Sequence, residues 1–411
     1  MKFRRETLDN GLEIIAECND SAHSMGVGFF VRTGARDETD DVAGVSHFLE
    51  HMVFKGTPRR TAEDVNREFD EIGAHYNAFT SEENTVYYAS VLPEYQEASI
   101  DILADVLRPS LRDDDFDMEK KVIIEEIQMY ADQPPFSMDD HIKELHYGRH
   151  PMARSVLGTV ETIGALRVEQ MRAYFESRYS PGNVFVAAAG RVDFDALVKQ
   201  VAARCGAWTP QPVRRETPPP RTTPTFKLVE RESSSQQYIL QVADAPASED
   251  SDRYAAKLLA TMFGDDSGSR LYWDLVDPGL AETASVGHYE YQGVGMYYTW
   301  MSCAPEDAAE NFAALRAAQQ LAEAEGFAED ELTRARSKLK ARVVLGSERP
   351  RNRLFNVGGN WMQRGEYRSV ADDLATIDAM TLADIHAVLK KHPLSRTSTV
   401  TIGPLAELQG A

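Results

Sequence analysis

Cysteine is nearly absent from this chain, with three residues in 411, at Cys18, Cys205 and Cys303. They lie far apart and include no C-x-x-C pair, so the sequence excludes a disulfide framework and a cysteine-based zinc site. Free cysteines suit a reducing compartment, whereas disulfides are typical of secreted proteins. We therefore predict a cytoplasmic protein.

Long apolar runs are also missing, since no stretch approaches the roughly 18 residues of a membrane-spanning helix. The N-terminal segment 1–7 carries basic residues, but no apolar signal-peptide core follows it. The segment also lacks the extended Arg- and Ser-rich stretch without acidic residues that is typical of a transit peptide. The sequence therefore predicts neither a membrane partner nor a targeting segment.

Basic residues are outnumbered, with 44 Lys and Arg against 65 Asp and Glu, so the formal net charge is −21. This charge disfavours nucleic acid and anionic membranes as partners and favours cationic or neutral peptides. A length of 411 residues also exceeds what one hydrophobic core usually supports. Two domains are therefore expected.

Histidine is scarce too, with ten residues, yet two of them stand four apart in His47-Phe48-Leu49-Glu50-His51. The segment 42–53 has the spacing of an amphipathic helix with His47, Glu50 and His51 on one face. Both imidazoles can then hold one Zn²⁺, with Glu50 placed to take a proton from water. The H-x-x-E-H order is the inverzincin signature. The alternative is a solvated helix face that carries two histidines by chance.

A hydrolytic zinc site needs a third protein ligand, and the helical pattern of 117–130 offers acidic candidates. Glu126 lies within an apolar stripe, Glu119 lies two turns earlier on nearly the same line, and Glu125 points away. The stripe consists of Val122, Ile123, Met129 and Tyr130. Because an unpaired carboxylate in an apolar face is costly, we predict Glu126 as ligand and Glu119 as its supporting carboxylate. The alternative is a helix whose acidic residues reach solvent.

Three further histidines follow this segment, at His141, His146 and His150. A helix through them would be interrupted by Gly148 and ended by Pro151. We therefore expect surface histidines there and no second metal site.

The chain divides most clearly at a Pro-rich segment, 209–225, which reads as an extended linker. On either side, 25–31 and 237–242 predict strands followed by a polar loop and an apolar helix. Long helical patterns of the second half are 305–325 and 328–344. The sequence therefore predicts an α+β protein with a zinc-bearing catalytic half at 1–208 and a similar non-catalytic half at 226–411.

These motifs resemble the pitrilysin-type (inverzincin) zinc metallopeptidases. The resemblance is greatest to the short branch of the mitochondrial processing peptidase β-subunit and bacterial processing proteases. It covers nearly the whole chain and implies two α/β-layered halves, with mostly antiparallel sheets covered by helices, facing each other across a chamber. Matching segments are 8–12, 44–57, 76–81, 91–94, 125–127 and 179–183.

The resemblance implies a zinc-dependent endopeptidase that hydrolyses unfolded peptides or oligopeptides. Glu126 matches the family's third zinc ligand, Glu119 its auxiliary glutamate and Glu50 its catalytic base. The resemblance implies that an extended substrate adds to an edge strand through hydrogen bonds between the two backbones. The alternative is an ordinary hairpin at the edge of a sheet. The substrate-binding residues implied are Asn77, Ala78, Phe79, Thr80 and Phe54.

One feature departs from the family pattern. Its peptidases take an Arg and a Tyr from the second half, around a turn like 279–281, to bind the substrate carbonyl. Here the Arg position falls on Leu275 or Val276 and the Tyr position on Glu282. None of these side chains can donate the required hydrogen bond.

In two-subunit members of the family a related zinc-less chain supplies that pair. The departure therefore predicts either a heterodimer with a related zinc-less chain, without which the protein is inactive, or a homodimer of low activity. Substitution by Arg270 or Tyr289 is one alternative, and a non-catalytic scaffold of the same fold is the other.

Overall fold

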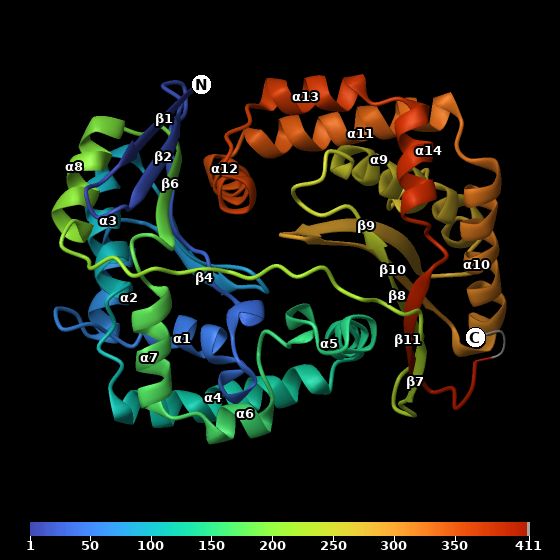
Figure 1. Ribbon diagram of the computed structural model, residues 1–411, viewed down its shortest axis with the longest axis horizontal. Coiled ribbons are helices and arrows are strands. Elements are labelled where there is room, and N and C mark those ends of the chain that lie inside the picture. The colour runs from blue at the N-terminus through green and yellow to red at the C-terminus, as the bar shows by residue number, and fades with distance from the viewer. Residues whose placement is uncertain (409–411) are drawn as a thin grey trace. The chain divides into compact units, whose positions relative to one another are not determined.

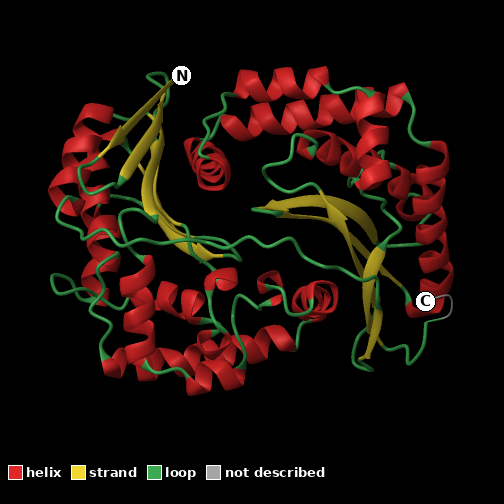
Figure 2. Ribbon diagram, in the orientation of Figure 1, coloured by secondary structure: helices red, strands yellow, loops and turns green. Residues whose placement is uncertain are grey.

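The computed structural model describes residues 1–408, which form two compact α/β units (Figures 1 and 2). Unit 1 contains Met1–Met129, Arg154–Glu216 and Leu345–Arg368, and unit 2 contains Tyr130–Ala153, Thr217–Val344 and the residues from Ser369 onward. The chain passes from unit 1 to unit 2 after Glu216, inside the Pro-rich segment. The predicted division into 1–208, 209–225 and 226–411 stays a prediction. It describes halves of the sequence, whereas each unit of the structure contains segments from both halves.

Unit 1 has a six-stranded sheet in the order β1-β2-β6-β3-β5-β4, and its neighbours are antiparallel except for β2 and β6. Every residue of β3 and β6 is buried, which agrees with their nearly continuous apolar sequences. The strands are β1 (Lys2–Thr7), β2 (Glu13–Cys18), β3 (Met25–Val31), β4 (His75–Thr80), β5 (Thr85–Val91) and β6 (Val184–Gly190). β4 therefore forms one edge of the sheet.

Helices cover both faces of this sheet. On one face, α1 packs Phe48 and Leu49 into a core with Phe29 and Tyr87. On the other face lies α12, a helix from the second half of the sequence. The helices of unit 1 are α1 (Val45–Val53), α2 (Ala62–Glu71), α3 (Gln96–Val106), α4 (Asp113–Ala131), α6 (Val160–Ala165), α7 (Val168–Arg178), α8 (Phe194–Cys205) and α12 (Pro350–Arg364), with the last turn of α4 crossing into unit 2.

The sheet of unit 2 repeats most of this topology. Its order β7-β11-β8-β10-β9 matches β2-β6-β3-β5-β4, including a single parallel pair at the first position. The predicted strands at 25–31 and 237–242 are the corresponding strands β3 and β8, which confirms their similarity. The strands are β7 (Phe226–Glu230), β8 (Gln237–Ala245), β9 (Thr283–Tyr291), β10 (Val294–Cys303) and β11 (Thr397–Gly403).

The helices of unit 2 are α5 (Pro134–Tyr147), α9 (Arg253–Gly264), α10 (Ala308–Glu325), α11 (Glu329–Ser347), α13 (Val370–Ala379) and α14 (Leu382–Lys391), with the end of α11 crossing into unit 1. α5 comes from the first half of the sequence and packs Met138 and Ile142 against Leu240 and Val400 of the sheet. Since α5 and α12 hold the same place in the element order of their halves, the two halves exchange equivalent helices.

His146 corrects an expectation from the sequence. It lies at the end of α5 and is 3% exposed, whereas a surface histidine was expected. Its Nδ1 lies 3.0 Å from Oγ of Ser398, and its Nε2 lies 3.3 Å from Oδ1 of Asp244. The exchange of α5 explains the difference, because it carries a histidine from the first half into the core of unit 2.

The helices around the zinc motif differ from expectation in two details. α1 begins at Val45 and not at residue 42, because Gly44 adopts a left-handed φ of +92° just before it. α4 begins at Asp113 with three aspartates in its first turn, where the helix dipole favours negative charge. Its expected apolar stripe is only partly buried, since Val122 and Met129 are exposed.

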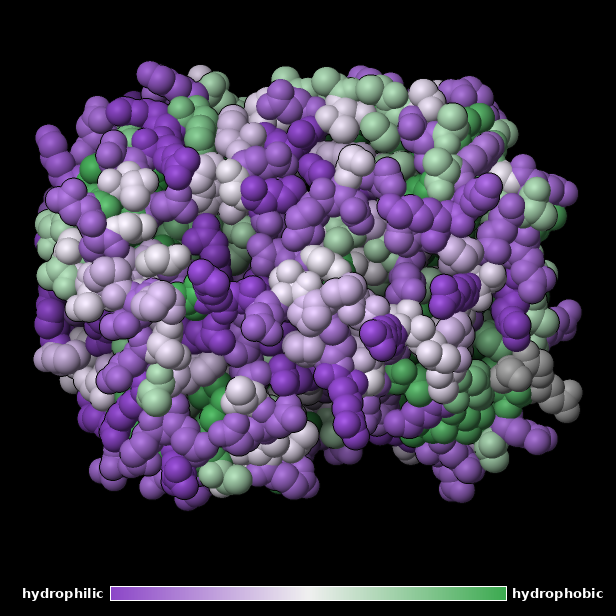
Figure 3. Space-filling view, viewed as in Figure 1, coloured by the Kyte–Doolittle hydropathy of each residue, from purple (hydrophilic) through white to green (hydrophobic). Residues whose placement is uncertain are grey.

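No helix within residues 1–408 has the length and apolarity needed to cross a membrane. Figure 3 shows hydrophilic residues over most of the visible face, with apolar residues interspersed. This distribution agrees with a chain in which 27% of the residues are charged.

A buried ion pair fixes the exchanged helix α12 to unit 1, and its loss should destabilise the protein. Arg353 donates to both carboxylate oxygens of Glu17, at 2.7 and 2.5 Å, and both residues are under 4% exposed. Arg353→Met would leave Glu17 buried without its partner, so we expect a loss of about 3–5 kcal/mol in the free energy of unfolding. Urea denaturation measures this loss.

The matched control is Arg334→Met, which breaks an exposed ion pair with Asp330 within α11. Such pairs contribute about 0.3–0.5 kcal/mol. Equal losses in the two variants would contradict a stabilising role of the Arg353 pair.

Candidate metal centre

The helix that carries the H-x-x-E-H motif is held at its N-terminus by a buried carboxylate. Glu38 is 3% exposed, and its two oxygens accept hydrogen bonds from the backbone N–H groups of Gly44 and Ser46, each at 2.7 Å. Burial raises the pKa of Glu38 to about 7, although these hydrogen bonds oppose the rise. The carboxylate supplies the hydrogen-bond acceptors that the first N–H groups of α1 lack.

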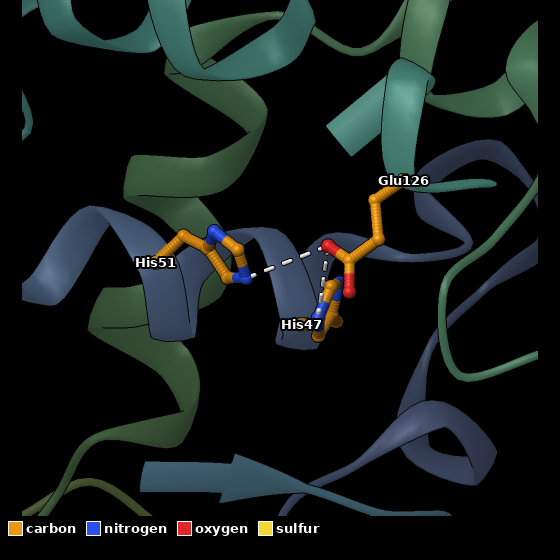
Figure 4. A group of neighbouring side chains, drawn as sticks. All are labelled: His47, His51 and Glu126. Carbon is orange, nitrogen blue, oxygen red and sulfur yellow. Dashed lines mark ion pairs between the residues drawn. The ribbon is translucent and has the colours of Figure 1, made fainter. Parts of the chain in front are cut away.

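His47, His51 and Glu126 converge on one point (Figure 4). Oε2 of Glu126 lies 3.9 Å from Nε2 of His47 and 3.7 Å from Nε2 of His51. The three candidate ligand atoms all lie within 4.8 Å of one another. Tetrahedral zinc ligands at about 2.0–2.1 Å from the metal are about 3.3 Å apart, so small side-chain movements would bring the three to that geometry.

Glu119 determines the proton position on His51. Its Oε1 lies 2.9 Å from Nδ1 of His51, and its Oε2 lies 2.5 Å from Nζ of Lys55. Burial raises the pKa of Glu119, but hydrogen bonds from His51 and Lys55 lower it more, so the net pKa lies below the ordinary value. An ionised carboxylate only accepts, so Nδ1 of His51 carries a proton, and Nε2 is the ring nitrogen that faces Glu126. Burial lowers the pKa of His51, but the bond to Glu119 and the nearby carboxylates raise it more, so the net pKa lies above the ordinary value.

His47, unlike His51, is held in the neutral form. It is 8% exposed, and burial together with the neighbouring His51 lowers its pKa to about 3. Among the described residues its buried Nδ1 has no hydrogen-bond partner, while Nε2 faces Glu126. Two imidazoles and a carboxylate form a donor set that suits zinc, which binds His51 in competition with a proton.

Glu50 lies on the same helix as the two histidines. Its Oε2 accepts a hydrogen bond of 2.6 Å from Oγ1 of Thr80, the last residue of β4. Burial raises the pKa of Glu50, and the bond from Thr80 opposes that rise. A carboxylate with a raised pKa beside a metal centre suits proton transfer from water.

The prediction of Glu126 over Glu125 agrees with the geometry, although one of its reasons does not hold. Glu125 is exposed, whereas Glu126 and Glu119 face the histidines. The apolar stripe that was expected to surround Glu126 leaves Val122 and Met129 exposed. The helical line that joins Glu119 and Glu126 was the valid part of the argument.

The residues implied in substrate binding lie in and beside β4. Asn77 is exposed, and its Oδ1 accepts a hydrogen bond of 2.9 Å from the backbone N–H of Ala78. Ala78 is buried, and Phe79 is 39% exposed. Phe54 is half-buried and packs against the rings of Tyr76 and Tyr87.

The second half offers little hydrogen-bonding capacity at the positions that depart from the family. Leu275 is fully buried, and Glu282 accepts a hydrogen bond from Gln236. Arg270 is committed to its own unit, since it donates to the carboxylate of Glu331 at 2.8 and 3.0 Å and to the carbonyl of Gly326 at 2.7 Å. These bonds weigh against Arg270 as the substitute.

The sequence patterns did not indicate Glu38 or Lys55, and they indicated Thr80 only as a substrate-binding residue and not as the partner of Glu50. Lys55 follows His51 by four residues, so the helical spacing that indicated the motif could have indicated it. Glu38 acts across an irregular loop, and Thr80 comes from a strand 30 residues away. No local pattern marks these two contacts.

Comparisons with known proteins find similar peptidases over nearly the whole length of the chain. Residues 13–160 match the family described as "Insulinase (Peptidase family M16)", and residues 165–339 match the "Peptidase M16 inactive domain". A protein named an uncharacterized zinc protease of Streptomyces coelicolor is 33% identical over an alignment of 421 positions, which covers 99% of this chain and 91% of that protein. A probable mitochondrial-processing peptidase subunit β of Arabidopsis thaliana is 28% identical, covering 98% of this chain and 79% of that protein.

Solved structures show the same fold. A protease from Helicobacter pylori superposes with a TM-score of 0.89 at 20% identity, covering 98% of this chain and 99% of that chain. A structure from Pseudomonas fluorescens titled as a peptidase M16 inactive domain gives a TM-score of 0.92 at 17% identity, covering 100% and 99%. The two α/β halves are therefore an arrangement shared with known structures.

Two neighbouring glutamates of α4 give a sharp test of the ligand set. We expect Glu126→Gln to lower zinc affinity strongly, because a neutral amide is a far weaker zinc ligand than a carboxylate. Glu125→Gln changes the same chemical group one residue away on the exposed side and should keep the affinity of the wild type. Competition with a chromogenic chelator measures both. Equal zinc affinity in the two variants would exclude Glu126 as a ligand.

Proposed function

Because this chain belongs to peptidase family M16, we propose that it is a zinc-dependent metalloendopeptidase that hydrolyses unfolded peptides and oligopeptides. The observation that carries the proposal is the convergence of two imidazole nitrogens and one carboxylate oxygen within 4.8 Å. The proposed zinc ligands are His47, His51 and Glu126, and the proposed compartment is the cytoplasm. The names of the relatives, which include several zinc proteases, support the choice of metal.

Glu50 is the proposed general base. When bound, zinc polarises the scissile carbonyl and lowers the pKa of the attacking water toward about 7. Glu50 takes the proton from that water and then passes it to the leaving amine. Its place on the helix turn between the two histidines supports this role, because the base lies beside both ligands.

Glu119 is proposed to act through His51. By accepting the Nδ1 proton at 2.9 Å it keeps Nε2 free to bind metal and fixes the orientation of the ring. Lys55 in turn holds the second oxygen of Glu119 at 2.5 Å. This chain of contacts supports a site in which the ring of His51 is held with Nε2 toward the proposed metal position.

The substrate is proposed to add as an extra strand along β4, the edge of the sheet. The backbone N–H of Ala78 faces away from β5, since it donates to the side chain of Asn77. A peptide strand can take over that hydrogen bond and leave Asn77 to solvent. Only an unfolded segment can pair in this way, which is why we propose unfolded peptides as substrates.

A second candidate is a zinc-bearing subunit that needs a partner chain. The positions expected to bind the substrate carbonyl hold Leu275 or Val276 and Glu282, and the nearby Arg270 is committed to Glu331. The similarity to a processing peptidase β-subunit supports such pairing. We therefore propose a heterodimer with a related zinc-less chain as the active form if the single chain is inert, and a homodimer of low activity otherwise.

Replacing the general base should separate chemistry from metal binding. We expect Glu50→Gln to lower kcat about 10²- to 10⁴-fold, because the amide cannot take a proton, while zinc per chain stays at the wild-type level. Elemental analysis and cleavage of an unstructured peptide library measure the two properties.

The three outcomes of this experiment differ clearly. A Glu50→Gln variant as active as the wild type would exclude Glu50 as the base. Zinc in the wild type without cleavage would favour the subunit that needs a partner, which adding a related zinc-less chain would then activate. Absence of zinc under metal-replete conditions would leave a non-catalytic scaffold.

Pairing along β4 predicts an alternating response to backbone methylation of a peptide substrate. In an antiparallel pair only every second residue exchanges hydrogen bonds with its neighbour. N-methylation of those amides should raise KM about fivefold each, the equivalent of about 1 kcal/mol per hydrogen bond, while the intervening amides tolerate it. A methyl scan of one cleaved peptide measures the pattern. An equal effect at every position would contradict strand addition.

A further inference from the structure

The carboxylate of Glu50 is held by a single side chain of the sheet. Within residues 1–408 Thr80 is its one hydrogen-bond partner, with Oγ1 of Thr80 donating to Oε2 of Glu50 at 2.6 Å. The contact joins α1 to the last residue of β4 across 30 positions of sequence. A short O–H···O bond to an ionised carboxylate is stronger than a bond between neutral groups. Thr80 therefore influences the orientation of this carboxylate more than any other hydrogen-bonding group described.

The hydroxyl of Thr80 is itself well fixed. The Cα of Thr80 lies opposite that of Thr85 in the register of β4 and β5. Thr85 is fully buried, and its Oγ1 donates to the carbonyl of Thr33, two residues after the end of β3, at 3.1 Å. The two threonine hydroxyls lie 3.5 Å apart. A β-branched side chain in a paired strand has few rotamers, so the donor hydroxyl is held by the sheet and not by a loop.

We propose that Thr80 is a positioning residue that holds Glu50 for catalysis. Its hydroxyl occupies Oε2, which leaves Oε1 as the oxygen that takes the proton from water. This inference rests on the proposed peptidase function, and it assigns to the side chain of Thr80 a role separate from that of the strand backbone. Because Thr80 belongs to the edge strand proposed to receive the substrate, one element sets the positions of both the peptide and the base.

The test compares Thr80→Val, Thr80→Ser and a control in the full chain. Valine keeps the shape and the strand preference of threonine but removes the donor, whereas serine keeps the donor. The control is Thr7→Val at the exposed end of β1, which forms the opposite edge of the same sheet. The measurements are kcat and KM on one unstructured peptide, zinc per chain, and the melting temperature.

We expect Thr80→Val to lower kcat about 10- to 100-fold, the range for losing a hydrogen bond to a charged group, with KM and zinc content unchanged. Thr80→Ser should regain most of the loss, and Thr7→Val should match the wild type. In a Glu50→Gln background, Thr80→Val should cause little further loss, because residues that act as a unit are not additive.

Four results would overturn the inference. A Thr80→Val enzyme with wild-type kcat shows that the base needs no such support. A raised KM with unchanged kcat assigns Thr80 to substrate binding. A loss of zinc or of folding in both Thr80→Val and Thr80→Ser assigns it to structure. A wild-type chain that holds zinc but cleaves nothing, both alone and after a related zinc-less chain is added, overturns the proposed function and this inference together. The first three results leave the proposed function standing.

Discussion

The structure depends on the burial of helix α1, a short helix that carries polar groups into the interior of unit 1. Burying unpaired polar groups is costly, so each of them needs a partner. Glu38 accepts from the backbone at the start of the helix, Glu119 accepts from His51, and Thr80 donates to Glu50. These contacts come from a loop, a helix and a strand, so the surrounding fold holds the start of α1, His51 and Glu50, while the buried Nδ1 of His47 has no partner among the described residues.

A second constraint acts on the sheets. Each sheet has apolar residues on both faces. Each half of the sequence supplies helices that cover one face of its own sheet, and one helix that covers a face of the other half's sheet. α12 packs on the sheet of unit 1 and is fixed there by the buried pair of Arg353 and Glu17, while α5 packs on the sheet of unit 2 with His146 between Ser398 and Asp244. A half expressed alone would leave one face of its sheet uncovered. Folding of the metal centre therefore depends on residues more than 220 positions beyond it in the sequence.

Local patterns in the sequence predicted the helices, the paired histidines and the line through Glu119 and Glu126, because the period of an α-helix relates residues three and four apart. The same reasoning could not predict Glu38 or Thr80, whose contacts depend on how separate elements pack. The same reasoning predicted His146 at the surface, because no local pattern shows that α5 packs on the sheet of the other half. It also began α1 too early, since hydrophobic spacing continued through a glycine whose backbone stops the helix. Contacts within one element were thus predictable, and contacts between elements were not.

The repeated topology explains how one half can lack the motif and still be needed. Strands β7-β11-β8-β10-β9 reproduce β2-β6-β3-β5-β4, and α9 follows β8 as α1 follows β3, yet α9 carries Leu258, Leu259 and Phe263 into its core without a histidine. Replacing a buried metal-binding face by apolar side chains removes the need for supporting carboxylates. The helix that the second half contributes to unit 1 remains necessary whether or not that half binds metal. Unit 1 therefore needs α12 from the second half of the sequence, although that half has no H-x-x-E-H motif.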